Sequence, residues 1–399
     1  MDRSKWEYKK LEVDNLPIGD VFDIFMGRTP SRDDLSFWED GNHEWVSIGD
    51  MGTTKYISDT KEKVSDKACS NMRLVPKDTV IMSFKLSIGK VAITEIPLYT
   101  NEAIMAFPPK SGYNISPNYL YYHLQAYKWQ SANRAVMGKT LNKAVISSSR
   151  ITIPDVETQQ RIVAELDCLN GMIALKQEQL KELDKLAQSI FYDMFGDPVT
   201  DEKGWDVIEL GDKCEVTSFK RVLIEDVVDS GVPFIRGTEL MALSKATKGE
   251  KIEFTLFITP EHYEQVKAIS GVPAVGDLLI PSINSEGNIW ILDTDEPRYY
   301  KDGRVLWVHV NHDAYTSEAL KFIMHILLKK TYSVMATGAT FAELKLFVLR
   351  ELKTILPPLA LQQQFAEKIQ AIEAQKELVK KSIAETQHLL DSRMDLYFD

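Results

Sequence analysis

The chain has 399 residues, with 47 Lys and Arg against 58 Asp and Glu, and a formal net charge of −11. Apolar residues make up 44% and charged residues 26%, which excludes a disordered or fibrous chain and, at this length, predicts two or three domains. The acidic balance argues only weakly against nucleic-acid binding, because binding needs a local patch of positive charge.

Residues 1–150 alternate short β-rich runs with turn residues. Runs such as HEWVSI, DTVIMSF, GKVAIT and AIMAF are separated by Gly, Pro, Asn and Asp, which is typical of short strands. The segment Ser116–Trp129 predicts one helix, with a serine near its start. We therefore expect an α+β domain with a twisted, mostly antiparallel sheet.

A long helix is predicted next. From Ile162 to Met194 apolar residues recur at alternating steps of four and three, which is a heptad seam interrupted only by Lys176. At about 1.5 Å per residue, a helix over residues 158–194 would be about 55 Å long. Gly196 suits the position after a helix and Pro198 prevents continuation, so the helix should end in the MFGDP sequence.

The second half repeats this order. Residues 200–350 contain further β-rich runs, among them VPFIRG, DLLIPSI, GNIWIL and RVLWVHV, and a predicted helix at Thr316–Lys330. A second heptad-like segment runs from Phe365 to Leu390. The chain should therefore consist of two globular units, each followed by a long helix.

An internal repeat supports this organisation. IPDVETQQRIVAEL at residues 153–166 aligns with LPPLALQQQFAEKI at residues 356–369, at an offset of 203. KDTVIMS at 77–83 aligns with GDLLIPS at 276–282, and the MGKTL sequence aligns with TGATF in the same order along the chain. The repeat predicts two related halves with a pseudo-twofold relation.

The two long helices have complementary interruptions in their seams. Lys176 of the first aligns with Val379 of the second, and Ile173 aligns with Lys376. This favours two helices that pack on each other in an antiparallel arrangement; the alternative is that each helix docks only on its own globular unit. The residues predicted to form helix packing or partner contacts are Ile162, Leu166, Leu169, Ile173, Leu180, Leu183, Phe365, Ile369, Ile372 and Ile383.

Cysteine and histidine positions predict no metal site. Cys69, Cys168 and Cys214 lie far apart and form no Cys-x-x-Cys pair, which is typical of reduced thiols. His123 and His325 lie in predicted helices without a second ligand four residues further on. The N-terminal sequence leads into no apolar signal segment, and no run approaches the roughly 18 apolar residues of a membrane span. We therefore expect a cytoplasmic protein that does not bind membranes.

Catalytic motifs are also missing from the sequence. Gly138-Lys139-Thr140 is similar to the end of a phosphate-binding loop, but Asn133 stands where that motif needs glycine. Pro154-Asp155 and Asp201-Glu202-Lys203 have the order of a nuclease motif, but the predicted long helix separates them. No Gly-x-Ser-x-Gly sequence, dinucleotide-binding loop or amino-methylation loop occurs. These observations favour a non-catalytic protein that serves recognition or scaffolding.

Positive charge is concentrated in one part of the chain. Residues 61–150 carry a net charge of +8, whereas residues 151–200 carry −5 and residues 201–350 carry −6. Cations on strand ends and loops are what phosphate neutralisation requires, so this run favours nucleic-acid binding over an ordinary solvated face. The cations of this run include Lys61, Lys63, Lys67, Arg73, Lys77, Lys85, Lys90, Lys128, Arg134, Lys139, Lys143 and Arg150.

These features together resemble the specificity subunits of type I restriction-modification systems. The resemblance rests on IPDVETQQRIV and LPPLALQQQFA at the helix starts, the MFGDP stop, GRTPS at residues 27–31 and SFKLSIGKVAIT at residues 83–94. It covers nearly the whole chain. The chain departs from the family pattern at Ala360-Leu361, where members usually have an acidic residue.

The resemblance implies an α+β fold in which two long antiparallel coiled-coil helices separate two target-recognition domains, with a pseudo-twofold internal repeat. It places the first target-recognition domain at residues 1–154 and a central spacer helix at 155–196. The second target-recognition domain would occupy residues 197–357, and a C-terminal spacer helix residues 358–399.

The resemblance also implies the function. The chain would not be an enzyme: each target-recognition domain would read one half of a bipartite, asymmetric site in double-stranded DNA, and the helices would dock two modification subunits. Those subunits would bring S-adenosylmethionine and methylate adenine N6. Restriction subunits, with ATP and Mg²⁺, would complete a host-defence complex, and no cofactor or metal is expected in this chain.

Polar residues of the strand and loop segments are the candidates for DNA contact, with Lys139 and Thr140 assigned to phosphates. The predicted DNA-binding residues are Ser83, Lys85, Ser87, Lys90, Asn101, Lys139, Thr140, Arg236, Thr238, Asn284 and Asn288. Two other functions stay open: a coiled-coil adaptor whose globular units bind only proteins, and a fused endonuclease-methyltransferase, which the missing motifs oppose.

Overall fold

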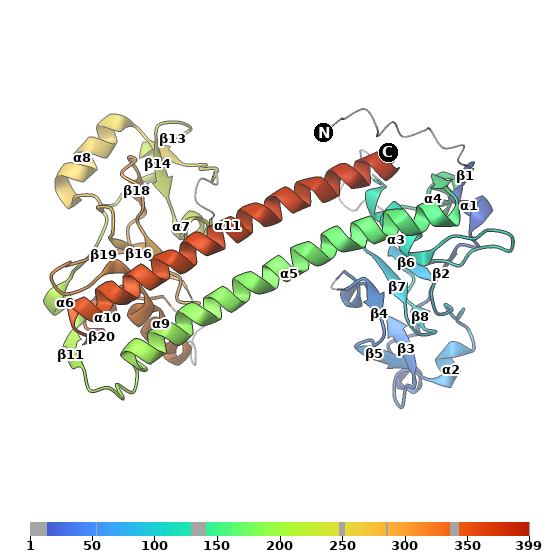
Figure 1. Cartoon of the computed structure of the whole chain (residues 1–399), viewed down its shortest axis with the longest axis horizontal. Coiled ribbons are helices and arrows are strands. Elements are labelled where there is room, and N and C mark those ends of the chain that lie inside the picture. The colour runs from blue at the N-terminus through green and yellow to red at the C-terminus, as the bar shows by residue number, and fades with distance from the viewer. Residues whose placement is uncertain are drawn as a thin grey trace. The chain divides into compact units, whose positions relative to one another are not determined.

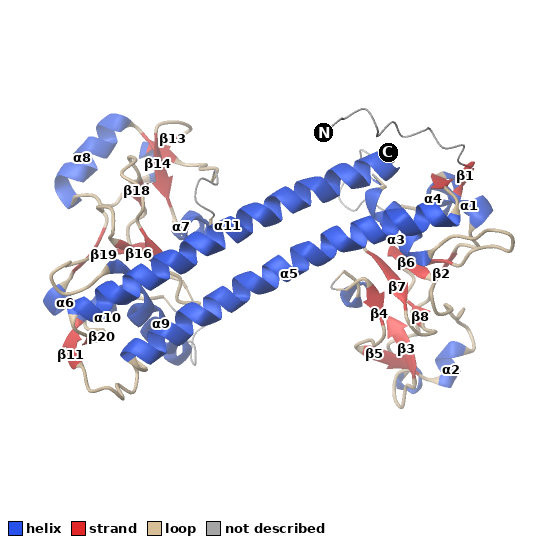
Figure 2. Cartoon of the chain, in the orientation of Figure 1, coloured by secondary structure: helices blue, strands red, loops and turns tan. Residues whose placement is uncertain are grey.

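The computed structural model describes residues 14–52, 54–127, 129, 141–246, 252–284, 286–335 and 343–398. The chain divides into two compact units. The first unit comprises residues 1–174 and 384–399, and the second comprises residues 175–383. Both units combine helices with sheets (Figure 2), so the predicted α+β class is confirmed.

A five-stranded sheet forms the centre of the first unit, in the order β2-β9-β6-β7-β4 (Figure 1). All pairs are antiparallel except β4–β7, which is parallel. Every residue of β6, β7 and β9 is buried, which indicates that the sheet is covered on both faces. The strands are β2 (Phe25–Met26), β4 (Tyr56–Ile57), β6 (Val80–Ser83), β7 (Val91–Thr94) and β9 (Ile104–Phe107).

Helix α3 (Pro117–Ala126) contacts β6 and β7. It lies inside the predicted segment and buries residues on successive turns, which are Tyr119, Leu120, Tyr122, His123 and Leu124. Elsewhere in the unit, Ile81, Ala92 and Ile104 of the sheet join a hydrophobic cluster that also contains Phe25.

A smaller three-stranded sheet, in the order β5-β3-β8, completes the first unit. Trp45 on β3 is buried against Val64, Ala68 and Tyr99, and its indole Nε1 donates to the backbone oxygen of Arg28 at 3.1 Å. The strands are β3 (His43–Val46), β5 (Glu62–Val64) and β8 (Tyr99–Thr100), and the short helices are η2 (Leu35–Phe37), η3 (Ile48–Asp50) and α2 (Asp66–Cys69).

The second unit contains two four-stranded sheets, in the orders β12-β19-β16-β17 and β13-β15-β14-β18. Their strands are β12 (Glu215–Ser218), β13 (Val227–Val228), β14 (Val232–Ile235), β15 (Phe257–Ile258), β16 (Leu278–Pro281), β17 (Trp290–Ile291), β18 (Tyr299–Tyr300) and β19 (Val305–His309). The helices around them are η5 (Ile224–Asp226), α7 (Gly237–Lys245), α8 (Pro260–Ser270) and α9 (Ser317–Met335).

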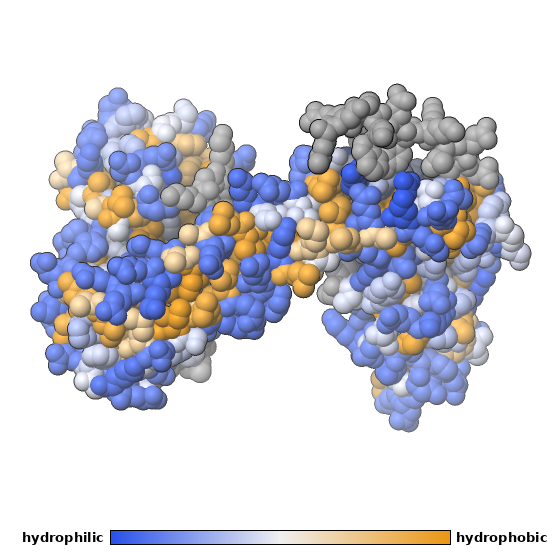
Figure 3. Space-filling view, viewed as in Figure 1, coloured by the Kyte–Doolittle hydropathy of each residue, from blue (hydrophilic) through white to orange (hydrophobic). Residues whose placement is uncertain are grey.

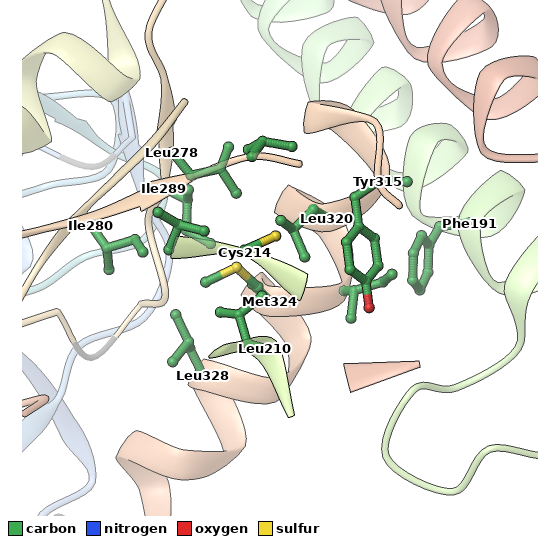
Figure 4. Packing of buried hydrophobic residues seen from close by; sticks show 14 of the residues in the cluster. Phe191, Leu210, Cys214, Leu278, Ile280, Ile289, Tyr315, Leu320, Met324 and Leu328 are labelled. Carbon is green, nitrogen blue, oxygen red and sulfur yellow. The ribbon is translucent and has the colours of Figure 1, made fainter. Parts of the chain in front are cut away.

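Helix α9 supplies much of the core of the second unit. Leu320, Met324 and Leu328 on this helix join one buried cluster with Leu278 and Ile280 of β16. Figure 4 shows these side chains, with Phe191 of a long helix beside Tyr315. The amphipathic segment predicted at residues 316–330 therefore becomes the helix that covers this sheet.

The predicted long helices are α5 (Val156–Phe195) and α11 (Leu359–Phe398), each of 40 residues. Helix α5 ends where the MFGDP sequence predicts, and Gly196 adopts a left-handed backbone with φ of 75°, a conformation that favours glycine after a helix. The heptad seam is the buried side of both helices, since Leu166 and Phe365 are completely buried.

The two helices run antiparallel in each unit (Figure 1). In the first unit Glu165 of α5 pairs with Arg393 of α11 at 2.8 Å. In the second unit the Lys376 ammonium lies 2.7 Å from the Asp184 carboxylate, and Lys176 Nζ donates to the Ser382 oxygen at 3.2 Å. Both lysines that interrupt the seams therefore bind the opposite helix, which confirms that the helices pack on each other.

The internal repeat appears in small matched sheets. Strand β1 (Asp14–Pro17) pairs antiparallel with β10 (Arg150–Ile153), and β11 (Asp206–Glu209) pairs in the same way with β20 (Lys353–Leu356). Each first strand runs into a four-residue helix, α1 (Ile18–Val21) or α6 (Leu210–Lys213). The partner strands are preceded by α4 (Lys143–Ser148) and α10 (Leu346–Arg350).

The most closely matched feature is a buried glutamine at the start of each long helix. The Gln159 amide accepts from the Ser116 N–H at 2.8 Å and donates to the oxygens of Pro154 and Asn114. The Gln362 amide accepts from the Thr316 N–H at 3.0 Å and donates to the oxygens of Pro357 and Ala314. The first glutamine of each predicted Gln-Gln pair therefore ties a long helix to its globular unit, and the second is exposed.

Candidate nucleic-acid interface

Three loops meet at one end of the five-stranded sheet of the first unit. They are residues 27–30 after β2, residues 84–90 between β6 and β7, and residues 101–103 between β8 and β9, and we call them the first loop cluster. Backbone bonds join them: Phe84 N–H donates to Ala103 O at 3.0 Å, and Arg28 N–H donates to Thr100 O at 2.8 Å. Gly27 is needed here, because a Cβ at this position would lie 2.0 Å from the Thr100 oxygen.

The β6–β7 loop is braced from inside by two residues that the sequence assigned to DNA contact. Ser83 is completely buried; its hydroxyl donates to Ser87 O and accepts from the Lys90 N–H. The Lys90 ammonium donates to Ile48 O at 3.3 Å and Met51 O at 3.0 Å. The buried Ser83 hydroxyl therefore braces the loop, and the Lys90 ammonium binds backbone carbonyls. The DNA contacts predicted for both residues stay a prediction.

The exposed face of the first loop cluster carries a different set of side chains. Lys85 is half-buried and Ser87 is exposed. Asn101 Oδ1 accepts from the Ala103 N–H at 3.0 Å, so its amide nitrogen is the group left for a ligand. Glu102 is exposed beside Thr29, and the hydrogen bond from the Thr29 hydroxyl holds the pKa of this carboxyl below its usual value, with a smaller contribution from the Lys85 charge.

Sequence reasoning missed three exposed residues of this cluster, which are Arg28, Leu86 and Glu102. Arg28 lies within the GRTPS motif, which was a usable signal, but the sequence carried no sign that Leu86 and Glu102 would be exposed. Lys139 and Thr140, assigned to phosphates, lie outside the described residues. Leu141, which follows them in the sequence, donates its N–H to Phe84 O at 3.1 Å and therefore lies beside the first loop cluster.

The second unit has a corresponding loop between β16 and β17. Asn284 is buried; its amide accepts from the Asn288 N–H at 2.9 Å and donates to Asn288 O at 2.6 Å. Asn284 therefore braces the loop, and its assignment to base contact stays a prediction. Asn288 is half-buried, and its side-chain amide donates to Glu286 at 3.1 Å.

Backbone bonds again gather other segments at this loop. Ser282 N–H donates to Arg304 O at 2.9 Å, and Leu344 N–H donates to Ser282 O at 2.7 Å. We call residues 219–221, 282–284, 286–289 and 301–304 the second loop cluster. Lys220, Arg221 and Lys301 are exposed, and none of these three forms an ion pair with a residue that the structure describes.

Arg236 and Thr238 lie at the start of α7, where both bind the same carboxylate. Arg236 Nε is 3.1 Å from Glu239 Oε1, and Thr238 Oγ1 donates to Glu239 Oε2 at 2.9 Å. Burial raises the pKa of Glu239, but the bonds from Arg236 and Thr238 outweigh this and lower it to about 2. The Arg236 charge is therefore balanced within the chain, which weakens its assignment as a phosphate or base contact.

Intramolecular ion pairs neutralise part of the positive charge of residues 61–150. Lys63 pairs with Glu44 at 2.6 Å, Lys67 pairs with Asp34 at 3.0 Å, and Arg73 pairs with Asp23. The hydrogen bond from Arg73 lowers the pKa of Asp23. Several cations counted from the sequence are thus neutralised by acidic residues before position 61, so the first unit offers fewer free cations than its net charge of +8 over residues 61–150 indicates.

The residues predicted for helix packing lie along the inner seam. Leu180 and Ile383 are half-buried. The other eight are buried, and they are Ile162, Leu166, Leu169, Ile173, Leu183, Phe365, Ile369 and Ile372. Apolar residues that a partner could reach lie outside this seam: in the second unit, Leu175, Leu186 and Leu378 are exposed, and Figure 3 shows apolar side chains gathered on this helix pair.

The described residues also bear on metal binding and on membrane insertion. No group of three or more His, Cys, Asp or Glu residues in these ranges could hold a metal ion. In the same ranges, no helix is both long enough and apolar enough to cross a membrane.

Comparisons with known proteins agree with this arrangement. A family model for the type I restriction modification DNA specificity domain matches residues 10–185. The specificity subunit of the type I restriction enzyme MjaIX from Methanocaldococcus jannaschii is 28% identical over 293 residues, which are 65% of this chain and 66% of that subunit. The chain thus matches just under two thirds of that relative's length.

Two solved structures share the fold over 97% of this chain. The type I restriction-modification S subunit from M. genitalium has a TM-score of 0.52 and 13% identity over 96% of its own chain. A chain from a structure on complex assembly and conformational transition of the type I R-M system has a TM-score of 0.60 and 18% identity over 97% of its length.

The comparisons confirm the predicted resemblance. Specificity subunits are the non-catalytic DNA-recognition components of type I restriction-modification systems, so the prediction that this chain is not an enzyme is also confirmed. The chain is thus similar to type I restriction-modification specificity subunits in its sequence and in its fold.

Proposed function

We propose that this chain reads a bipartite, asymmetric DNA site, with the first loop cluster on one half-site and the second on the other. The observation that carries this proposal is a loop built twice on the same plan. The β6–β7 and β16–β17 loops are each braced by a buried polar side chain, Ser83 or Asn284. Each loop also accepts a backbone hydrogen bond from a residue much later in the chain, Leu141 or Leu344.

The side chains that the two loops expose differ in chemistry, which supports two different half-sites. The first loop presents Lys85, Leu86 and Ser87, whereas the second presents Ile283, Glu286 and Asn288. Base edges in the major groove differ in their donors, acceptors and methyl group. Two readers with different exposed groups should therefore select different bases, and the site should be asymmetric.

The charge distribution supports a contribution of partner subunits to the binding of DNA phosphates. The chain has a net charge of −11, and several cations of the first unit are already paired with acidic residues. Phosphate contacts supply much of the affinity of a DNA-binding protein. The chain alone should therefore bind DNA weakly and with steep salt dependence, and the assembled complex should bind it more tightly.

The partners are proposed to be two modification subunits docked on α5 and α11. Exposed apolar residues on these helices, such as Leu175 and Leu378, offer contact area that the chain does not cover itself. The modification subunits would carry S-adenosylmethionine and methylate adenine N6 in the cytoplasm. Restriction subunits, which would use ATP and Mg²⁺, would cleave unmodified DNA.

Mapping of methylated adenines tests this proposal. The genome would be sequenced for base modification in the parent strain, in a strain lacking this gene, and in the deletion strain complemented with it. We expect one split, asymmetric motif that is methylated only when the gene is present. An unchanged methylome, with an active modification subunit in the cell, would instead favour a protein-binding adaptor.

A further inference from the structure

Leu86, at the tip of the β6–β7 loop, has two unfavourable properties at once. Its side chain is 89% exposed, and its backbone lies in the left-handed region with φ of 60°. Exposure of a large aliphatic side chain forgoes the free energy of burial. A non-glycine residue at positive φ also carries strain, which tends to persist at sites of function. Neither property helps the chain to fold.

The loop that carries Leu86 is held in one conformation. The Ser83 hydroxyl bridges Ser87 O and the Lys90 N–H across the base of the loop. Gly89 N–H donates to Ser83 O at 2.9 Å, and the Lys90 ammonium anchors the loop to the turn after β3. Because the base of the loop is fixed, the backbone of Leu86 is already ordered, which lowers the entropic cost of binding.

The surroundings of Leu86 are charged. Lys85 precedes it, and the Lys85 charge acts on Glu102, which shares the first loop cluster with the exposed Arg28. A single leucine among cations does not offer the continuous apolar surface that a protein partner would bury. It does suit a polyanion whose phosphates meet the cations while the tip reaches between the two backbones.

The chemistry of the major groove limits the base groups that the Leu86 side chain can contact. A leucine side chain has no hydrogen-bonding group, and the thymine 5-methyl is the apolar group that base pairs present in this groove. We propose that Leu86 contacts the 5-methyl group of one thymine in the half-site read by the first loop cluster, and thereby selects a T·A pair at that position. This inference rests on the proposed function, since it requires the chain to read DNA.

The second loop cluster provides an internal comparison. The corresponding loop, residues 282–289, presents Glu286 and Asn288, and its exposed aliphatic residue, Ile283, lies next to the end of β16 and is 44% exposed, half as much as Leu86. Its polar side chains can accept or donate hydrogen bonds to base edges. The thymine-methyl preference should therefore be strongest in the half-site that the first loop cluster reads.

Replacement of thymine by uracil tests the contact directly, because it removes only the methyl group. The complex of this chain with its modification subunits would be titrated with duplexes of the mapped site, each with one thymine replaced by uracil. For the wild-type complex we expect one position at which uracil weakens binding about fourfold, the loss expected for one methyl group. For Leu86→Ala, binding to the normal site should weaken and that position should no longer distinguish uracil from thymine.

Leu35→Ala is the matched control, since Leu35 is also exposed, at 60%, but belongs to η2 outside the first loop cluster. It should keep the wild-type response at every thymine, and both variants should keep the wild-type melting temperature. Equal uracil responses of the wild-type and Leu86→Ala complexes, or a first half-site without a T·A pair, would overturn the inference while leaving the proposed function intact. If the wild-type complex shows no specific site at all, both fail.

Discussion

Replacement of Gln159 by alanine should destabilise the first unit by about 3 kcal/mol. The side chain is 1% exposed and makes three hydrogen bonds to backbone groups, at 2.8 Å to Ser116, 2.9 Å to Pro154 and 3.2 Å to Asn114. Alanine removes all three, and each unmet bond in a buried site costs about 1 kcal/mol. Gln362→Ala should cost the second unit a similar amount, because the amide makes the same three kinds of bond.

The neighbouring glutamines provide matched controls. Gln160 and Gln363 are exposed, so their alanine variants should change the free energy of unfolding by less than about 0.5 kcal/mol. Urea unfolding of the full chain, followed by circular dichroism, would compare the four variants with the wild type. A Gln159→Ala variant as stable as Gln160→Ala would refute the conclusion that this amide ties α5 to the globular part of the first unit.

Further predictions concern the loops, the helices and pH. Lys90→Met should lower the melting temperature, because two backbone carbonyls lose their donor; Lys85→Met should leave it unchanged and reduce the salt dependence of DNA binding by about one counterion. Leu183→Asp, which puts a charge into the core of the second unit, should cost more than about 3 kcal/mol in urea unfolding. By contrast, Leu175→Asp, at a residue 74% exposed, should keep the fold and weaken co-purification of modification subunits. Burial lowers the pKa of His123 from 6.5 to about 4, so the unfolded chain binds more protons between these values. Stability should fall as pH falls through this window, and a His123→Phe variant whose unfolding shows the same pH dependence would contradict this assignment.

The helices were predictable because their signals are local and periodic. The heptad seam from Ile162 onward and the MFGDP stop define α5 to within about two residues at each end. The complementary interruptions of the two seams, at Lys176 and Lys376, predicted that the helices contact each other, since a charge in a seam needs a partner opposite it. The predicted domain boundaries stay a prediction, because the compact units divide within the long helices.

The loop residues were less predictable, because their roles depend on contacts between distant segments. Ser83 and Asn284 are polar residues at strand ends, and such residues are as suited to bracing a loop as to binding DNA. Similarly, the charge count over residues 61–150 gave no sign that Glu44 and Asp34 would pair with lysines of this run. Periodicity therefore predicted the scaffold, whereas the exposed reading surface required the tertiary structure.

A chain with a duplicated second domain tests the central claim, that each globular domain reads its own half-site. Residues 206–353 would replace residues 14–150, so that both joints keep the matched strands of the repeat. The methylome of a strain carrying this chain should show an inverted repeat of the second half-site. Methylation of the original asymmetric motif by this chain would contradict the claim.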